Sequence, residues 1–222
     1  GFLRRGMVNE ALTEYETVIS HNPLSAEAWM HKAALLAGMD RMDDALIAID
    51  RAIEMEPQEK LSIFNRGIIY AQMDRFSDAL SDFESVIRMD DSFSAAYAAK
   101  ADVLFNLGNV EGAIESYSSA IDRTPEEAVF YFTRAIALIK TNQLNEAMGD
   151  FQTAVSLEPD REEYRSQMDL LQIFLGSSEE HSQQSQKTSH TEQIKSKEEL
   201  LGYYFLQNGD REKAKYYLRQ AI

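Results

Sequence analysis

Residues 45–57 read ALIAIDRAIEMEP, and the same pattern of small, apolar and polar residues returns three times at one fixed interval. It returns as ALSDFESVIRMDD at 79–91, AIESYSSAIDRTP at 113–125 and AMGDFQTAVSLEP at 147–159. The interval is marked by five evenly spaced alanines: Ala11, Ala45, Ala79, Ala113 and Ala147. A fixed period of this length is typical of proteins built from stacked copies of one small helical unit.

Each copy is predicted to contain two helices joined by a turn. In the quoted stretch, Ala45, Ile49 and Ile53 recur every four residues and form one face of a helix. An earlier helix is predicted because a large apolar residue stands sixteen residues before each alanine except the first. These residues are Trp29, Ile63, Tyr97 and Tyr131. Gly38 and Asp40 lie between the two predicted helices of one copy and suit a turn.

Proline marks the end of most copies. All four prolines of the chain stand twelve residues after a repeated alanine: Pro23, Pro57, Pro125 and Pro159. Proline has no backbone N–H to donate and restricts the residue before it, so it ends the second helix. Asp91 occupies this place in the remaining copy.

The unit resembles the tetratricopeptide repeat. Residues that match the family's signature in two successive units are Trp29, Ala45, Ala52 and Pro57, then Gly67, Tyr70, Ala79 and Phe83. The resemblance covers about residues 1–176 and again 195–222. It implies an all-α fold, a right-handed α-solenoid superhelix of stacked antiparallel helix pairs.

The repeat divides the chain into three regions. The first, 1–176, is predicted to hold a partial repeat (1–25), four full repeats (26–59, 60–93, 94–127 and 128–161) and the first helix of a sixth (162–176). Residues 177–194 are almost entirely polar, so a surface insert or a degenerate helix is expected there. A further helix pair is expected over 195–222.

A basic residue replaces the leucine that the family usually carries three residues after the opening aromatic: Lys32, Arg66, Lys100 and Arg134. Sixteen residues after these four stand, in order, Ala48, Asp82, Ser116 and Asp150. Because only the arginines have an aspartate there, we interpret each Arg–Asp pair as a bridge between the two helices of one repeat. The lysines are expected to lay their stems along the apolar seam and reach water. The alternative is a cationic stripe for an acidic ligand.

Composition excludes several classes of protein. The 222-residue chain has a formal net charge of −15 and no cysteine. This argues against a nucleic-acid partner and excludes a disulfide scaffold or a thiolate zinc site. The four histidines form no metal-binding pair, and no phosphate-binding glycine motif or nucleophile elbow is present. We therefore expect no catalytic residue, cofactor or metal, and a protein that is not an enzyme.

No apolar run is long enough to span a membrane, so no membrane insertion is expected. The expected location is the cytoplasm. Because Gly1 falls inside a repeat, the natural N-terminus is expected to be missing from the sequence.

The resemblance also implies where a partner binds. In the family, the first helix of each unit lines a concave groove that holds a peptide or helix of another protein. Carried over by register, the groove residues are Met30, Leu61, Phe64, Asn65, Ile68, Asp102, Phe105, Asn106, Val129, Phe132, Ile136 and Ile139. Most are apolar, so the expected partner is a protein or peptide with an apolar or amphipathic helical segment. The alternative for any one of them is packing between repeats.

Three functions stay open on the sequence alone. The first is a non-catalytic adaptor or scaffold that binds such a segment in the groove. The second is a self-associating structural scaffold, which would form homo-oligomers. The third is a regulatory arm of a larger enzyme whose catalytic domain lies outside these residues.

Overall fold

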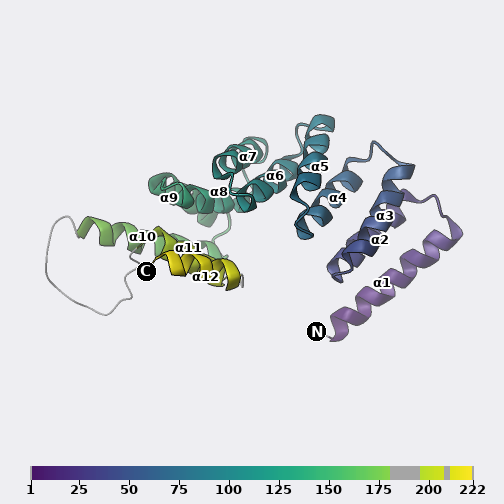
Figure 1. Ribbon diagram of the computed structural model, residues 1–222, viewed down its shortest axis with the longest axis horizontal. Helices are drawn as coiled ribbons and strands as arrows, with labels where there is room; N and C mark the ends of the chain where they lie inside the picture. The colour runs from purple at the N-terminus through teal and green to yellow at the C-terminus, as the bar shows by residue number, and fades with distance from the viewer. Residues whose placement is uncertain (1, 181–195, 208–210, 222) are drawn as a thin grey trace. The chain divides into compact units, whose positions relative to one another are not determined.

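Helices make up all the regular structure in residues 2–180, 196–207 and 211–221, the part of the chain that this computed structural model describes (Figure 1). The all-α prediction is therefore confirmed for these residues. The chain divides into two compact units, Gly1–Leu107 and Gly108–Ile222. Helices α1 to α6 belong to unit 1, and helices α7 to α12 belong to unit 2.

In unit 1, helices that follow one another along the chain pack side by side. The tightest packing joins α2 to α3 and α4 to α5, which are the two helices of one repeat in each case. The helices are α1 (Phe2–His21), α2 (Ala26–Gly38), α3 (Met42–Met55), α4 (Lys60–Gln72), α5 (Phe76–Met89) and α6 (Ser94–Asn106).

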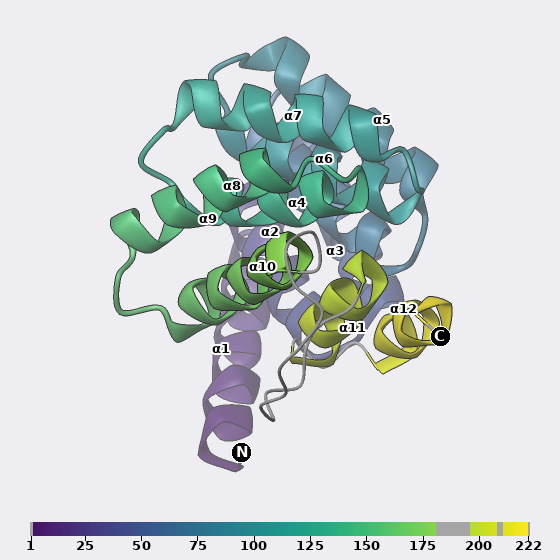
Figure 2. The same ribbon diagram turned by 90° about the vertical axis from the view of Figure 1, so that its left-hand side faces the viewer.

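Unit 2 has the same pairing of α8 with α9, and of α11 with α12 (Figure 2). Its helices are α7 (Val110–Arg123), α8 (Ala128–Lys140), α9 (Leu144–Leu157), α10 (Glu162–Glu180), α11 (Lys197–Gln207) and α12 (Arg211–Gln220). Helix α10 runs four residues beyond the 162–176 predicted for it, because residues 177–180 contain no proline or glycine to end it. The rest of the polar insert predicted at 177–194 lies outside the described residues.

The turns that follow the first helices share one backbone feature. A residue with positive φ occupies the same place in four successive repeats: Asp40 (62°), Asp74 (56°), Gly108 (82°) and Asn142 (65°). Aspartate, asparagine and glycine are the residues that tolerate this left-handed conformation best. The prediction that Asp40 lies in the turn is confirmed. Gly38, which was predicted to lie in the same turn, is instead the last residue of α2.

Small residues allow the two helices of each repeat to approach closely. The repeated alanines are completely buried at Ala45, Ala79, Ala113 and Ala147. In the pair α4–α5, a Cβ atom added to Gly67 would lie only 2.6 Å from the ring of Phe83. In α11–α12, a Cβ atom on Gly202 would lie 2.5 Å from Leu218. The contact between glycine and a large apolar side chain therefore recurs in both units.

Helix α5 ends without a proline, and Asp90 forms the turn instead. The Asp90 carboxylate accepts hydrogen bonds from the Ser92 backbone N–H (3.0 Å) and from the Ser92 hydroxyl (2.6 Å). The Lys60 ammonium at the start of α4 also donates to Asp90. Together these contacts lower the pKa of Asp90 from 3.8 to about 2, with Lys60 as the largest cause.

This pKa predicts an acid-sensitive contribution to stability. Because the pKa is lower in the folded chain, the contribution is complete above about pH 4 and is lost as the pH falls through about 2. Asp90→Asn is therefore expected to lower the melting temperature at pH 7, and the difference from wild type should shrink towards pH 2. Circular dichroism melts across this range measure it. In Lys60→Met the acid loss should be smaller and should end at a higher pH, because the pKa of Asp90 in the folded chain then lies closer to its unfolded value. A difference that stays constant down to pH 2 would contradict the assignment.

Candidate interaction surface

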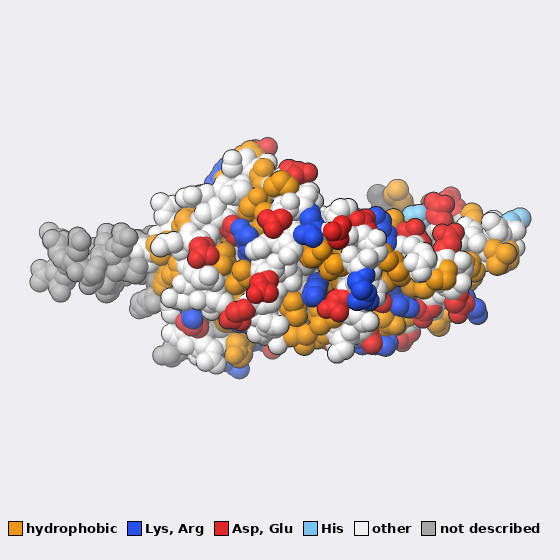
Figure 3. Space-filling view, turned by 90° about the horizontal axis from the view of Figure 1, so that it is seen from above, with side chains coloured by type: hydrophobic (Ala, Val, Ile, Leu, Met, Phe, Trp, Pro, Cys, Tyr) orange, Lys and Arg blue, Asp and Glu red, His pale blue; other side chains and the backbone are white. Residues whose placement is uncertain are grey.

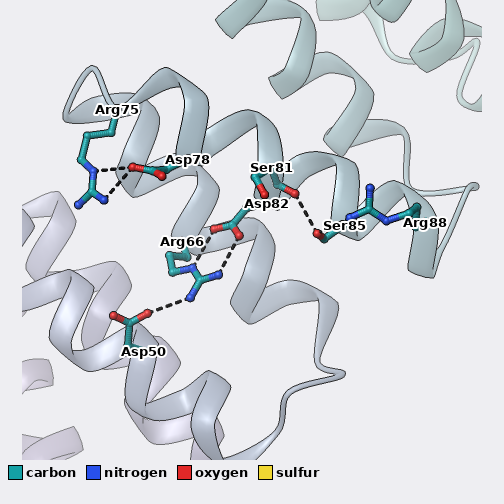
Figure 4. A network of polar contacts seen from close by, with 8 residues as sticks. All are labelled: Asp50, Arg66, Arg75, Asp78, Ser81, Asp82, Ser85 and Arg88. Atoms are coloured by element: carbon teal, nitrogen blue, oxygen red, sulfur yellow. Dashed lines mark hydrogen bonds and ion pairs between the residues drawn. The ribbon is translucent and has the colours of Figure 1, made fainter.

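Arg66 connects three helices of unit 1 (Figure 4). Its guanidinium donates two hydrogen bonds of 2.8 Å to the two carboxylate oxygens of Asp82 on α5. A third nitrogen, Nη1, donates to Asp50 on α3 at 3.0 Å. The Asp82 hydrogen bonds raise the pKa of Arg66 above its ordinary value, so the charge is fixed. The predicted bridge within the repeat is confirmed, and a link to the preceding repeat is added to it.

Arg134 repeats this arrangement in unit 2. It donates two hydrogen bonds of 2.7 Å to Asp150 on α9, and its Nη1 donates to the Ser118 hydroxyl on α7 at 2.9 Å. Asp150 is buried, and its bidentate partner fixes the orientation of α8 against α9. The second predicted Arg–Asp bridge is therefore also confirmed.

The expectation for the lysines was wrong. Their ammonium groups do not simply reach water: Lys32 lies 3.1 Å from Glu16, and Lys100 lies 2.9 Å from Glu84. Each glutamate stands sixteen residues before its lysine, on the second helix of the preceding repeat. No aspartate stands sixteen residues after either lysine, so each ammonium pairs with this glutamate instead. All four basic residues are thus engaged in links within the array, which argues against a cationic stripe for a ligand.

The sequence-predicted groove residues of unit 1 lie on its first helices, α2, α4 and α6. On α4, Leu61 keeps 42% of its surface exposed, while Phe64, Asn65 and Ile68 are half-buried. The Phe64 ring packs against Phe83, with a centroid distance of 5.7 Å, and edge-on against Phe93 at 5.2 Å. One side of Phe64 is therefore held by the core, and the other side faces outward.

The flanking first helices contribute the other predicted residues of unit 1. Met30 on α2 is half-buried and packs against the α2–α3 core. On α6, Phe105 is half-buried, whereas Asp102 and Asn106 are exposed. Helix α4 contacts both α2 and α6. Two pairs of these residues share a place in the repeat: Met30 with Phe64, and Ile68 with Asp102. We call this surface the α2–α4–α6 face; its members are Met30, Leu61, Phe64, Asn65, Ile68, Asp102, Phe105 and Asn106.

The predicted residues of unit 2 differ in accessibility. Val129 is half-buried, but Phe132, Ile136 and Ile139 keep only 3%, 3% and 1% of their surface exposed. These three residues on α8 are therefore buried in this structure, and their part in partner binding stays a prediction. Helix α11 packs against α8, and the Phe132 ring also packs against Phe151 of α9.

Aromatic rings form much of this cover. The Phe132 ring lies 4.5 Å from the ring of Tyr164 on α10 and 6.0 Å from the ring of Tyr204 on α11, measured between centroids. At the other end of α8, the Lys140 ammonium lies 5.9 Å from the ring centroid of Tyr217 on α12. The pair α11–α12 thus contacts α8 near both of its ends.

The prediction missed a depression on α10. Its volume is about 430 Å³, and its lining includes Ser166, Leu170 and Ile173, with Glu162, Arg165 and Asp169 around them. Ser166, Leu170 and Ile173 stand one repeat period after Phe132, Ile136 and Ile139. Extending the register by one more repeat would have found them.

Two further observations concern other kinds of site. Within the described ranges, no group of three or more His, Asp and Glu side chains is placed to hold a metal ion. No helix of that part of the chain is both long and apolar enough to cross a membrane. The face visible in Figure 3 intersperses acidic, basic and apolar side chains.

We compared the chain with known protein families and structures. Three family models, each described as a tetratricopeptide repeat, match residues 1–60, 32–104, and 94–127 with 128–161. Together they cover most of the chain. No curated protein sequence matches it.

Solved structures of similar fold include the following three proteins. A thermophilic TPR protein of Thermus thermophilus is 17% identical, with a TM-score of 0.66 over 78% of this chain and 94% of that chain. YrrB, described as a TPR protein with an unusual peptide-binding site, is 18% identical, with a TM-score of 0.56 over 94% and 90%. MamA from Desulfovibrio magneticus RS-1 is 16% identical, with a TM-score of 0.57 over 88% and 92%. At such identities the likeness establishes the fold alone.

Repeats of this kind generally serve as scaffolds for protein interaction rather than as catalysts, and they bind protein or peptide partners. The constant repeat period, the helix pairs with their buried alanines and the three matching models lead to one conclusion: this chain belongs to the tetratricopeptide repeat family.

Proposed function

We propose that the chain is a non-catalytic adaptor that binds an amphipathic helix or apolar peptide of a partner protein on the α2–α4–α6 face. One observation carries the proposal. Phe64 and Ile68 stand two repeats before Phe132 and Ile136, in the same F-x-R-x-I sequence, and a helix already lies on the α8 copy of this surface. In unit 1 the same residues are half-buried.

Helix α11 indicates which ligand such a surface accepts. Tyr204 of α11 lies against Phe132, and Leu200 and Leu201 of the same helix are buried. A ligand of the α2–α4–α6 face is therefore expected to be a helix with an aromatic and leucine stripe, which is the usual pattern for a helix bound in a groove. Basic flanking residues would suit it, because Asp102 is exposed on this face and the chain carries a net charge of −15.

A photo-crosslinking residue tests the surface directly. It is introduced in place of Leu61 on the face, or in place of Ile47 on α3, which is 64% exposed and serves as the matched control. Exposure of the source cell's extract to light is expected to link a partner at position 61 only. Mass spectrometry of the linked peptide should identify an amphipathic helix. Equal capture at both positions would refute the assignment.

A charge substitution supplies the complementary prediction. Leu61→Asp is expected to reduce capture at least tenfold, because it buries a carboxylate against an apolar ligand. The fold should tolerate it, since Leu61 is exposed and an acidic residue suits the first turn of a helix. Ile47→Asp should leave capture unchanged. Retained capture by a folded Leu61→Asp chain would count against the α2–α4–α6 face.

A further inference from the structure

Residues at the same place in the repeat are half-buried on α4 of unit 1 and buried on α8 of unit 2. Helix α11 contacts α8, where Tyr204 lies against Phe132, and Phe132, Ile136 and Ile139 are all buried. We propose that the helix pair α11–α12 is a reversible occupant of the α8 surface: it leaves as a unit and uncovers a second binding surface. The proposal relies on the proposed function only for the kind of ligand that then binds.

The pair has packing contacts of its own that do not involve α8. Helix α11 meets α12 where Gly202 faces Leu218, the same close approach that joins α4 to α5. The rings of Phe205 and Tyr217 stack at a centroid distance of 5.4 Å with 7° between their planes. Ala214 of α12 is buried at the position of the repeated alanines. These contacts all lie within the pair.

The α11–α12 pair packs less extensively against the rest of unit 2 than its two helices pack against each other. Helix α11 contacts α8 and α10 much more sparsely than it contacts α12. Tyr204 against Phe132 and Tyr217 against Lys140 are contacts at the two ends of α8. Local openings with few buried contacts need less free energy than global unfolding. Release of the pair is therefore expected to precede unfolding of α8 and α9.

Release would create a continuous apolar surface. Phe132, Ile136 and Ile139 on α8 would become accessible beside the depression on α10, where Leu170 and Ile173 already line the surface. An exposed apolar patch of this kind marks an interaction site. Its register matches that of the α2–α4–α6 face, so it fits the same ligand, an amphipathic helix with a leucine and aromatic stripe. The resident pair and such a ligand would compete.

The chain contains no cysteine, so single thiols can report on the opening. Three variants are compared under native conditions with a maleimide reagent. Ile68→Cys places the thiol on the half-buried surface of α4, and Ile136→Cys places it on the buried surface of α8. Ala147→Cys places it in the completely buried core at α9. The rate at position 136 is expected to be at least about tenfold slower than at 68 and at least about tenfold faster than at 147.

Other orders of the rates overturn the proposal. Equal rates at 136 and 147 mean that only unfolding uncovers α8, and equal rates at 136 and 68 mean that the pair is not resident. Protection of position 136 that grows with protein concentration assigns the cover to a second copy instead. If Ile136→Cys perturbs folding by circular dichroism, Ile139→Cys reports the same surface.

A substitution in α11 tests whether its contact with α8 controls the release of the pair. Tyr204→Ala is expected to raise the labelling rate at 136 about tenfold while the rates at 68 and 147 stay unchanged. Tyr216→Ala is the control, because Tyr216 is 60% exposed on α12. An unchanged rate at 136 in Tyr204→Ala overturns the role assigned to this contact. None of these outcomes depends on a partner, so they stand apart from crosslinking at position 61.

Discussion

Phe83→Ala is expected to lower the free energy of unfolding by about 3–5 kcal/mol, the largest effect of any substitution considered for this chain. The Phe83 side chain is completely buried and fills the space that Gly67 leaves between α4 and α5. It also packs in one cluster with Ala99 and Val103 of α6. Removal of the ring leaves a cavity that rigid helices cannot close, so both burial and packing are lost. Urea unfolding followed by far-ultraviolet circular dichroism measures the change.

Leu61→Ala is the matched control for this prediction. Leu61 lies on α4, the helix that Phe83 of α5 packs against, but it is 42% exposed, so its truncation is expected to cost less than about 1 kcal/mol. The contrast separates the two sides of α4, one of which stabilises the array while the other remains available to a ligand. A loss below about 1 kcal/mol for Phe83→Ala would mean that α4 and α5 do not depend on this ring.

The helix pairs could be predicted because the physics that forms them is local and repeated. An alanine at the same place in every repeat signals a close helix approach, and the large residue four positions later signals what fills the gap, as with Ala79 and Phe83. The bridges of Arg66 and Arg134 could be predicted for a related reason. Each arginine occurs with an aspartate at a fixed distance, and the sixteen-residue spacing joins the two helices of one repeat.

Contacts between repeats were harder to predict. The same spacing read backwards from Lys100 gives Glu84, but nothing in the sequence says whether a lysine bonds forward, backward or not at all. A lysine carries one point charge on a flexible stem, so its partner depends on which carboxylate lies nearest after folding.

The accessibility of the binding residues could not be predicted either. Phe64 and Phe132 are identical in register, yet Phe64 is half-buried and Phe132 is almost fully covered. Phe132 contacts Tyr164 of α10 and Tyr204 of α11, and α11 starts at Lys197, long after α8 ends. Periodicity describes the packing of consecutive helices. It contains no information about a later helix pair that folds back onto an earlier one.

Arg66→Met is expected to destabilise the chain by roughly 2–3 kcal/mol. The substitution retains an apolar stem but removes the cation from Asp82, which is only 5% exposed and accepts two hydrogen bonds from Arg66. A carboxylate left without its partner in such a site costs more free energy than the intact ion pair contributes to stability. Arg66 itself is one-quarter exposed, which keeps the expected loss below that of a fully buried pair.

Two further variants show where that loss comes from. In Arg66→Met with Asp82→Leu, both charges are gone and apolar side chains replace them, so at least half of the lost stability is expected to return. Lys100→Met removes only the exposed contact with Glu84 and should cost less than about 1 kcal/mol. Urea unfolding compares all three. Equal losses for Arg66→Met and Lys100→Met would mean that the bidentate contact with Asp82 adds nothing, and that the basic residue acts only through its link to the preceding repeat.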